Sequence, residues 1–422
     1  MKGRMTRILE SELERIKPSS QEEERMGRIV MEFLKKLNSN LRKSRAEAMM
    51  GGSFAKGTTI RKRRYDVDLF ALFKDDEGIS DKLEKALRAL KIRYDRLPGS
   101  RDYFSINMNS EGLKFKVEIV PVFRIRKSGD ARNVTDVSML HVDYVKKKIR
   151  KNPKLADDIR MAKAFCYARD CYGAESHIKG FSGYCLEILT ANYGSFLSLM
   201  RNAAKWNEKV VIDPEKFYGS KDEIMNELNE AKLASPLILI DPVQKNRNAA
   251  AALGKEKYKI FVDAARRFLK SPSRSFFERK EFDPERLKKD ARRKKLVLFE
   301  VDAMSKRAKE DISGAKLLKL HNVMVRMLEK EGYKVESKWV FSENSSKSYM
   351  TLKKPKKIMQ KGPPVARLKH AEEFRRRWKK VFVKQGNLYT ERKPKDAGKI
   401  LNLDKKLLKD MGIDSFKVGK IL

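Results

Sequence analysis

Apolar residues recur with helical spacing over the first forty residues, and two later segments alternate apolar and polar positions. From Ile8 to Leu41 the spacing predicts an amphipathic helix, and Pro18–Gln21 predicts a break followed by a new helix start. Gly51–Ser53 indicates a turn, with a short helical segment after it. The alternating segments, Tyr65–Phe73 and Lys114–Phe123, predict strands joined by a linker of Asp, Asn, Ser and Gly residues. These elements describe a small mixed α/β domain.

The rest of the chain divides into a helix-rich part and a mixed part. We predict three domains, at residues 1–150, 151–272 and 273–422, in a fold of the α+β class. The third domain is expected to contain an antiparallel sheet. Its predicted elements are a helix around Ala315–Lys330 and strands at Leu296–Val301, Ser337–Phe341 and Ser348–Leu352.

No segment indicates export or insertion into a membrane. Met1–Lys36 is charged and helical in pattern, unlike a signal peptide. The most apolar stretch, Phe181–Met200, contains Glu187 and several small polar residues, so we expect a buried helix there. The three cysteines lack the paired spacing of a zinc site and are too few for a disulfide framework, which favours a reducing, cytoplasmic location.

The chain is strongly basic. It has 97 Lys and Arg residues against 57 Asp and Glu residues, a formal charge of +40. Such a field attracts polyanions, of which nucleic acid is the commonest. A ribosome-associated protein, a membrane-surface binder and a generally basic proteome are alternatives. Residues 351–400 contain 17 Lys or Arg and four acids, so the basic excess is strong there.

Acidic residues interrupt both predicted strands. Asp66 and Asp68 stand two positions apart, so both carboxylates project from one face of a strand, while Val67 and Leu69 point to the other. Glu118 is the acid of the second strand, and if the strands are neighbours the three carboxylates converge. Hard oxygen ligands of this kind suit Mg²⁺ and two-metal phosphoryl transfer. The alternative is an exposed strand face with ordinary surface acids.

A Gly-Gly-Ser turn precedes the first acidic strand. Gly51–Ser53 lies 13 residues before Asp66 and can offer backbone N–H groups and a hydroxyl to a triphosphate. A lone turn of this composition is usually only a turn. In this order, however, the Gly-Ser turn, the Asp-x-Asp pair and the acid on a later strand resemble the signature of nucleotidyltransferases of the polymerase β type.

Four further stretches narrow the resemblance to the archaeal-type (class I) CCA-adding enzymes. They are Asn133–Val145, Tyr172–Tyr184, Asp241–Ala251 and Lys361–Phe374. The similarity covers nearly the whole chain. It implies a polymerase β-like nucleotidyltransferase head, a helical central domain and an α+β C-terminal RNA-binding body and tail.

The resemblance also implies roles for individual residues. Asp66, Asp68 and Glu118 would be catalytic and hold two Mg²⁺ ions. Residues expected to bind the nucleotide are Gly52, Ser53, Lys56, Ser138, His141, Lys163, Tyr172 and Arg247. Arg247 would help to read the base edge. Four positions depart from the family's usual residues, which are Glu, Asp, Arg and Thr where this chain has Asp66, Glu118, Lys56 and Ser138.

Several of these residues also have ordinary structural interpretations. His141 suits a packing role as well as a ligand role. Tyr172 suits an aromatic core, and Lys163 occupies a helix on which a basic residue usually faces water. The run Arg61–Arg64 just before the first acidic strand suits a solvated charge run, with contact to RNA or pyrophosphate as the alternative.

The function implied by the resemblance is template-independent addition of C, C and A to the 3′ end of tRNA from CTP and ATP. The partners are then tRNA, through its acceptor stem, T-arm and 3′ end, and nucleoside triphosphates, with no membrane. A homodimer is compatible with the sequence. Two alternatives stand: a poly(A) polymerase-like enzyme, and a paralogue that binds structured RNA without catalysis. The complete set of carboxylates argues against the second.

Overall fold

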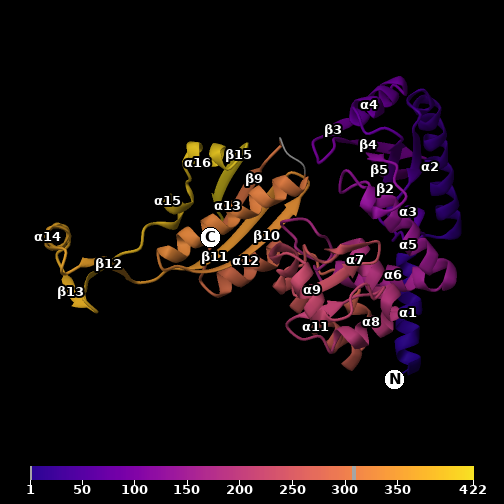
Figure 1. The fold of residues 1–422 in the computed structure, drawn as a ribbon. Coiled ribbons are helices and arrows are strands. Elements are labelled where there is room, and N and C mark those ends of the chain that lie inside the picture. The colour runs from indigo at the N-terminus through magenta and orange to yellow at the C-terminus, as the bar shows by residue number, and fades with distance from the viewer. Residues whose placement is uncertain (1, 307–309) are drawn as a thin grey trace. The chain divides into compact units, whose positions relative to one another are not determined.

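The structure, a computed structural model, describes residues 2–306 and 310–422 (Figure 1). The chain forms two compact units, one ending at Lys280 and the other comprising Glu281–Leu422. No helix in the described part of the chain is both long enough and apolar enough to cross a bilayer.

A five-stranded mixed sheet organises the beginning of the first unit. Its strand order is β1-β2-β5-β4-β3, with β2 and β5 parallel and the other pairs antiparallel. The strands are β1 (Glu47–Met50), β2 (Tyr65–Phe73), β3 (Asp95–Leu97), β4 (Tyr103–Ser110) and β5 (Leu113–Phe123). The two strands predicted from alternation are confirmed.

Two helices cover the apolar face of this sheet. The predicted break is confirmed between α1 (Lys2–Ile16) and α2 (Ser20–Leu41), where the Ser19 hydroxyl caps α2 by accepting the Glu22 N–H at 3.2 Å. Together α2 and α4 (Ile79–Ala89) bury a leucine-rich stripe against the sheet residues that alternate with the acids. The acidic residues are thereby left on the other face.

The expectation of a plain linker between the two acidic strands is wrong. That segment forms α4, β3 and β4, and β4 pairs with β5. In β4, Phe104 and Ile106 are buried while Asn107 and Asn109 are exposed, so the two asparagines occupy one side of a true strand. Their turn-forming composition concealed the alternation.

The remainder of the first unit is mostly helical. Its helices are α3 (Gly52–Ala55), α5 (Ser138–Lys151), α6 (Leu155–Ala168), α7 (Gly183–Tyr193), α8 (Phe196–Ala203), α9 (Lys221–Glu227), α10 (Glu230–Leu233) and α11 (Lys255–Lys270). It also contains a small sheet that the sequence analysis did not predict, made of β6 (Val210–Ile212), β7 (Leu237–Asp241) and β8 (Gln244–Asn248).

The apolar stretch Phe181–Met200 is buried as expected, but it is not one helix. Gly194, with φ of +83°, ends α7, and the Ser195 hydroxyl accepts the Ser198 N–H to begin α8. The stretch packs into an aromatic core around Phe165.

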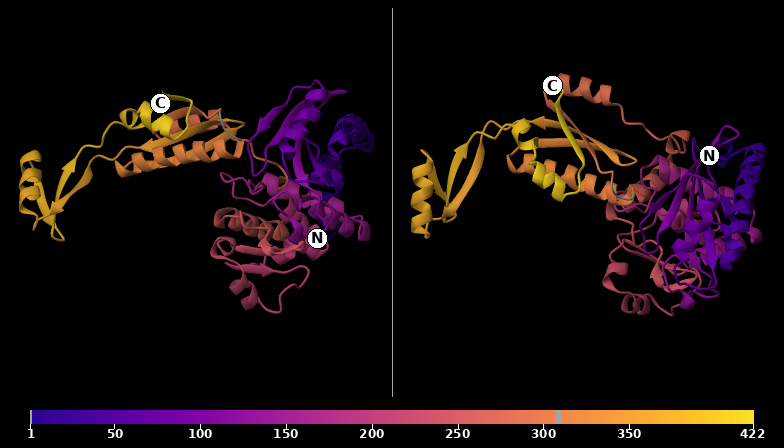
Figure 2. Two further views of the ribbon diagram at one scale, coloured as in Figure 1. Left: turned by 45° about the horizontal axis from the view of Figure 1, so that its top comes forward. Right: turned by 90° about the horizontal axis from the view of Figure 1, so that it is seen from above.

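The second unit confirms the predicted antiparallel sheet. The order is β10-β11-β9-β15, and α13 lies along the sheet (Figure 2). A second sheet, β12-β14-β13, is followed along the chain by two short helices. The elements are α12 (Pro284–Arg293), β9 (Val297–Met304), α13 (Glu310–Lys330), β10 (Lys334–Ser342), β11 (Ser345–Lys353), β12 (Ile358–Pro364), α14 (Leu368–Arg377), β13 (Val381–Lys384), β14 (Asn387–Arg392), α15 (Ala397–Leu401), α16 (Lys405–Asp410) and β15 (Ser415–Lys420).

Candidate active site

Two neighbouring parallel strands carry the three acids that the sequence analysis selected. The register of β2 and β5 places Asp68 directly opposite Glu118. Val67 and Leu69, which alternate with the aspartates, are 1% and 0% exposed and face the core under α2 and α4. The side chains of Asp66, Asp68 and Glu118 therefore project from the opposite face of the sheet.

Burial and mutual repulsion together set the electrostatics of these acids. Burial, and then the charges of Glu118 and Asp66, raise the pKa of Asp68 to about 6. The ammonium of Lys62 lies 2.8 Å from the Asp66 carboxylate, and that of Lys116 lies 2.9 Å from Glu118. Each outer acid is thus paired with a lysine, whereas the central one has no ion-pair partner among the described residues.

This donor set fits a divalent cation. Among the described residues, no three His, Cys, Asp or Glu side chains are gathered closely enough to form a metal cluster. The three acids nevertheless supply only carboxylate oxygens, the ligands that Mg²⁺ prefers. A cation between them would also relieve the repulsion that raises the pKa of Asp68.

The Gly-Gly-Ser turn lies directly against the central carboxylate. Gly51 N–H donates to the Asp68 carbonyl oxygen at 2.7 Å. Gly52 has φ of +57°, and a Cβ atom at this position would lie 1.8 Å from Asp68 Oδ2. Only glycine allows so close an approach of backbone to carboxylate. Ser53, the next residue, stands at the start of α3, so the turn and the acids form one site.

A buried carboxylate joins two of the candidate lysines. Glu187 on α7 is 1% exposed and accepts hydrogen bonds from Lys56 Nζ at 2.6 Å and Lys163 Nζ at 2.8 Å. The Thr58 hydroxyl accepts a further bond from Lys163 at 2.9 Å. Burial opposes ionisation of Glu187, but the charges of Lys163 and Lys56 lower its pKa below the ordinary value. Lys163 is 3% exposed, so the interpretation that it faces water is wrong.

The sequence analysis assigned no role to Glu187. Its signal was present, because an acid within the most apolar stretch of a chain requires a partner when that stretch is buried. What the sequence did not reveal was that its partners, Lys56 and Lys163, lie 131 and 24 residues away.

Tyr172 points toward the same place. A Cβ atom at Gly183, one turn before Glu187 on α7, would lie 3.0 Å from the Tyr172 hydroxyl. Burial raises the pKa of Tyr172, and the charges of Glu187, Glu175 and Asp66 raise it further. The Tyr172 phenol is therefore a neutral hydrogen-bonding group, and it is close enough to Glu187 and Asp66 to feel both charges.

Asp241 contacts two further nucleotide-binding candidates, His141 and Arg247, and also Tyr184. This residue, 0% exposed, accepts from Arg247 Nη1 and from the Tyr184 hydroxyl, the latter at 3.1 Å. His141 Nε2 lies 3.1 Å from Asp241 Oδ2, and its ring stacks on Tyr184 with centroids 4.1 Å apart. Burial opposes ionisation of Asp241, but His141 and Arg247 contribute to a pKa below its ordinary value. Ser138 begins α5 one turn before His141.

The two buried networks meet at Tyr184. The ammonium of Lys56 lies 5.8 Å from the centre of the Tyr184 ring, whose other contacts are with His141 and Asp241. All candidates thus belong to the first unit. The contacts tie Lys56, on the segment after α3, to α7, and Tyr184 of α7 connects it in turn to Asp241 at the end of β7.

Comparison with solved structures identifies the fold, which is shared with a terminal U-transferase and a poly(U) polymerase. A cytoplasmic RNA terminal U-transferase is similar over 67% of this chain and 100% of its own, with a TM-score of 0.52 and 16% identity. A poly(U) polymerase is similar over 65% and 98%, with a TM-score of 0.51 and 15% identity. The family model for the second domain of tRNA nucleotidyltransferases matches residues 157–278, and that for second messenger oligonucleotide or dinucleotide synthetases matches residues 4–138.

Relatives with greater sequence identity show the family. The CCA-adding enzyme of Nanoarchaeum equitans is 35% identical over 82% of this chain and 83% of its own length. The CCA-adding enzyme of Methanocaldococcus jannaschii is 30% identical over 91% of this chain and 87% of its own length. The chain belongs to the family of CCA-adding enzymes.

Proposed function

We propose that the protein adds C, C and A to the 3′ end of tRNA, using CTP and ATP and no nucleic-acid template. The observation that carries the proposal is the register of Asp68 with Glu118, together with Gly52 held against the Asp68 carboxylate. The similarity to CCA-adding enzymes over most of the chain supports this choice of substrate.

The three acids would hold divalent cations, with Mg²⁺ the expected ion. Enzymes of this kind generally use a divalent metal with nucleoside triphosphates. When bound at Asp66, Asp68 and Glu118, two such ions would activate the attacking hydroxyl and stabilise the leaving oxygen. In the reaction, the 3′ oxygen of the RNA forms a bond to the α-phosphorus, and the bond from that phosphorus to the pyrophosphate oxygen breaks.

The triphosphate would be bound by the turn and the two lysines. The backbone of Gly52, the Ser53 hydroxyl and the ammonium groups of Lys56 and Lys163 supply donors and positive charge. Two ammonium groups face one carboxylate, Glu187, so the network keeps a surplus positive charge for the phosphates. Substrate alignment by such fixed groups accounts for much of the rate in phosphoryl transfer.

The sugar and base would be contacted from the central part of the unit. Tyr172 is proposed to contact the sugar, with Ser138 and His141 nearby on α5. Arg247 would present its planar fork to the base edge. Because Asp241 binds one nitrogen of Arg247 and also contacts His141, it would fix the orientation of both.

The RNA would be bound through its acceptor stem and T-arm. A-form grooves expose little sequence to side chains, so contacts to backbone and shape are expected. The basic segment 351–400 is a suitable surface for them. We assign catalysis to residues 1–150, completion of the nucleotide site to 151–272 and RNA binding to 273–422. A cytoplasmic location follows from tRNA as substrate, and a homodimer is compatible with this scheme.

The test is the identity of the added nucleotides. The full chain is incubated with Mg²⁺ and a tRNA transcript lacking CCA, with CTP, ATP or both, and the 3′ ends are sequenced. We expect two C residues with CTP alone and complete CCA with both. An extended A tail would instead support the poly(A) polymerase alternative, and no addition would leave only an RNA-binding protein.

A further inference from the structure

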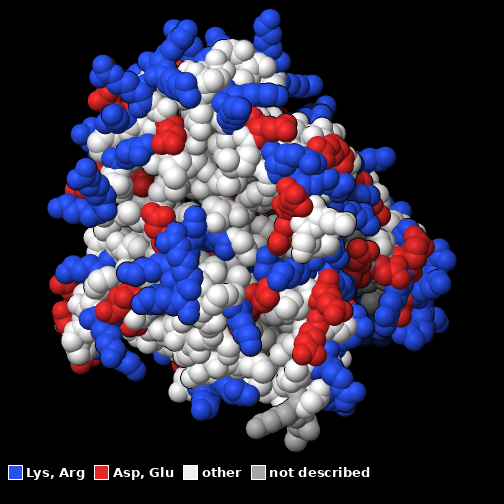
Figure 3. Space-filling view, turned by 90° about the vertical axis from the view of Figure 1, so that its right-hand side faces the viewer, with Lys and Arg blue, Asp and Glu red and all other residues white. Residues whose placement is uncertain are grey.

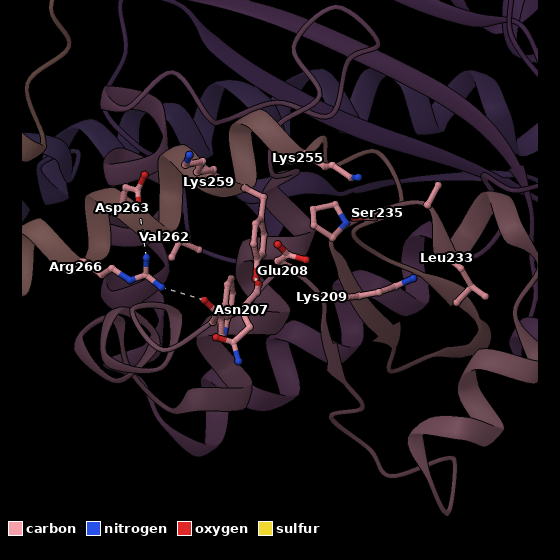
Figure 4. A pocket seen from close by; sticks show the side chains of 14 residues that line it. Asn207, Glu208, Lys209, Leu233, Ser235, Lys255, Lys259, Val262, Asp263 and Arg266 are labelled. Carbon is pink, nitrogen blue, oxygen red and sulfur yellow. Dashed lines mark hydrogen bonds and ion pairs between the residues drawn. The ribbon is translucent and has the colours of Figure 1, made fainter.

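A groove in the first unit lies outside the site described above. It is bounded by α11, by residues 206–209 and by residues 233–236, and it has a volume of about 960 Å³ (Figure 4). The stacked rings of Trp206 and Tyr258, with centroids 5.8 Å apart, contribute to its lining. Among the described residues that line it, none is an active-site candidate.

The groove is lined by three lysines that form no ion pair with any described residue, and also by two acids, Glu208 and Asp263. Lys255 and Lys259 stand four residues apart on one face of α11, and Lys209 belongs to the segment before β6. The side chains of all three are exposed, and none of them has a hydrogen-bond or ion-pair partner within the part of the chain that the structure describes. Like charges four residues apart on a helix repel by about 0.2–0.5 kcal/mol. An external anion would remove this cost.

The nearest arginine is already occupied. Arg266 donates to the carbonyl oxygens of Ala204 and Trp206 and lies 3.5 Å from Asp263 (Figure 4). Its planar fork, which would suit recognition of a base edge, is thus committed to the protein. The cations left available are ammonium groups, which bind phosphate as point charges and do not require one fixed geometry.

We propose that this groove binds the phosphate backbone of the RNA substrate, at a second contact separate from the reacting 3′ end. The inference rests on the proposed function for its ligand. An open groove with several point charges and apolar lining tracks a nucleic-acid backbone without reading its sequence. Lys and Arg side chains are spread widely over the face shown in Figure 3, so charge density alone does not select a binding surface. Here unpaired lysines coincide with a cavity.

The test replaces the three lysines together, as Lys209→Gln, Lys255→Gln and Lys259→Gln. Binding to tRNA lacking CCA is measured by fluorescence anisotropy between 0.05 and 0.3 M salt, chosen as about the range in which phosphate contacts dominate. The Kd is expected to rise on the order of tenfold, and the slope of log Kd against log salt to fall by about 2, since each phosphate contact contributes about 0.7–0.9. The KM for CTP should not change.

A matched control removes the same charge elsewhere. Lys35, Lys36 and Lys43 are exposed on and just after α2 and have no side-chain partner among the described residues. Their triple Gln variant should leave the Kd within about twofold, as expected of surface changes. An equal loss in both variants would mean non-specific attraction and would overturn the proposal.

Two other results would also overturn it. One is an unchanged Kd for tRNA in the groove variant. The other is a raised KM for CTP with normal RNA binding, which would make the groove a nucleotide pocket. Failure of the proposed function is separately visible, because the wild-type chain would then add no CCA, whatever the groove variant does.

Discussion

The buried carboxylate of Glu187 gives a quantitative test of how the site is held together. Glu187→Gln keeps the shape of the side chain but removes its charge, leaving the ammonium groups of Lys56 and Lys163 without a counter-ion. Those side chains are 7% and 4% exposed, so water screens them little. Breaking a buried pair in this way costs about 3–5 kcal/mol.

This loss is large enough to measure by heating. For the first unit, which ends at Lys280, unfolding entropy scales to a decrease in Tm of about 5–9 °C for that loss. The melt is followed by circular dichroism in metal-free buffer. Glu24→Gln, at an exposed acid on α2 that has no ion-pair partner among the described residues, should change stability by no more than about 0.5 kcal/mol.

A second substitution separates lost charge from lost packing. Adding Lys163→Met to Glu187→Gln removes one uncompensated ammonium, so part of the lost stability should return. If Glu187→Gln melts within about 1 °C of the Glu24→Gln control, which is less than 1 kcal/mol on this scale, the two-lysine network does not stabilise the unit and the reasoning is wrong.

Three further predictions concern the acids, the turn and the base-reading arginine. Gly52→Ala should reduce nucleotide incorporation by about 100-fold or more in single-turnover assays, because the added Cβ would displace Asp68. The control Gly57→Ala, where φ is +64° but space is open, should retain most activity, and equal losses in the two variants would contradict the argument. The Asp68 carboxyl, whose pKa is raised to about 6, stays protonated below that pH, so the metal-free protein should lose stability as the pH rises through 6. The rise in Tm that Mg²⁺ induces should shrink as the pH falls through 6, because Asp68 must be ionised to bind the ion. Equal Mg²⁺ shifts at pH 5 and 7.5 would refute this. Arg247→Lys should lower kcat/KM about 10–100-fold for CTP and ATP through loss of the fork's charged hydrogen bonds, and unchanged kinetics with both nucleotides would remove Arg247 from the site.

The parts of the fold that were predictable are those in which one period dominates. Alternation across Tyr65–Phe73 and Lys114–Phe123 gave both acidic strands, and Pro18–Gln21 gave the break between α1 and α2. The sequence analysis could not predict that the two acidic strands are neighbours, because strand pairing depends on contacts between distant segments. The parallel register of Asp68 with Glu118 is a tertiary fact.

The misses have identifiable physical causes. In β4, Asn107 and Asn109 occupy the exposed side, so a composition typical of turns obscured a real strand. In Phe181–Met200, burial on all sides hid the boundary between α7 and α8, and only Gly194 with Ser195 marked it. The apolar run of β7 is too short to distinguish from a buried helix by period alone.

The candidate site was predictable as a set of residue types but not as a network. Asp66, Asp68 and Glu118 followed from alternation, whereas the roles of the remaining candidates came from resemblance. Neither route suggested Glu187 or Asp241 as the residues that join them, because each connects side chains far apart in the sequence. Burial of a charged group is visible only once the chain is folded.

The most direct test of the central claim compares wild type with Asp68→Asn on tRNA lacking CCA, with Mg²⁺, CTP and ATP present. We predict that the wild type completes CCA and stops, and that the variant, still folded by its melting curve, loses incorporation by about 1,000-fold or more, as for loss of an electrostatic catalytic group. Undiminished incorporation by Asp68→Asn would contradict the assignment of the carboxylates, whatever the substrate.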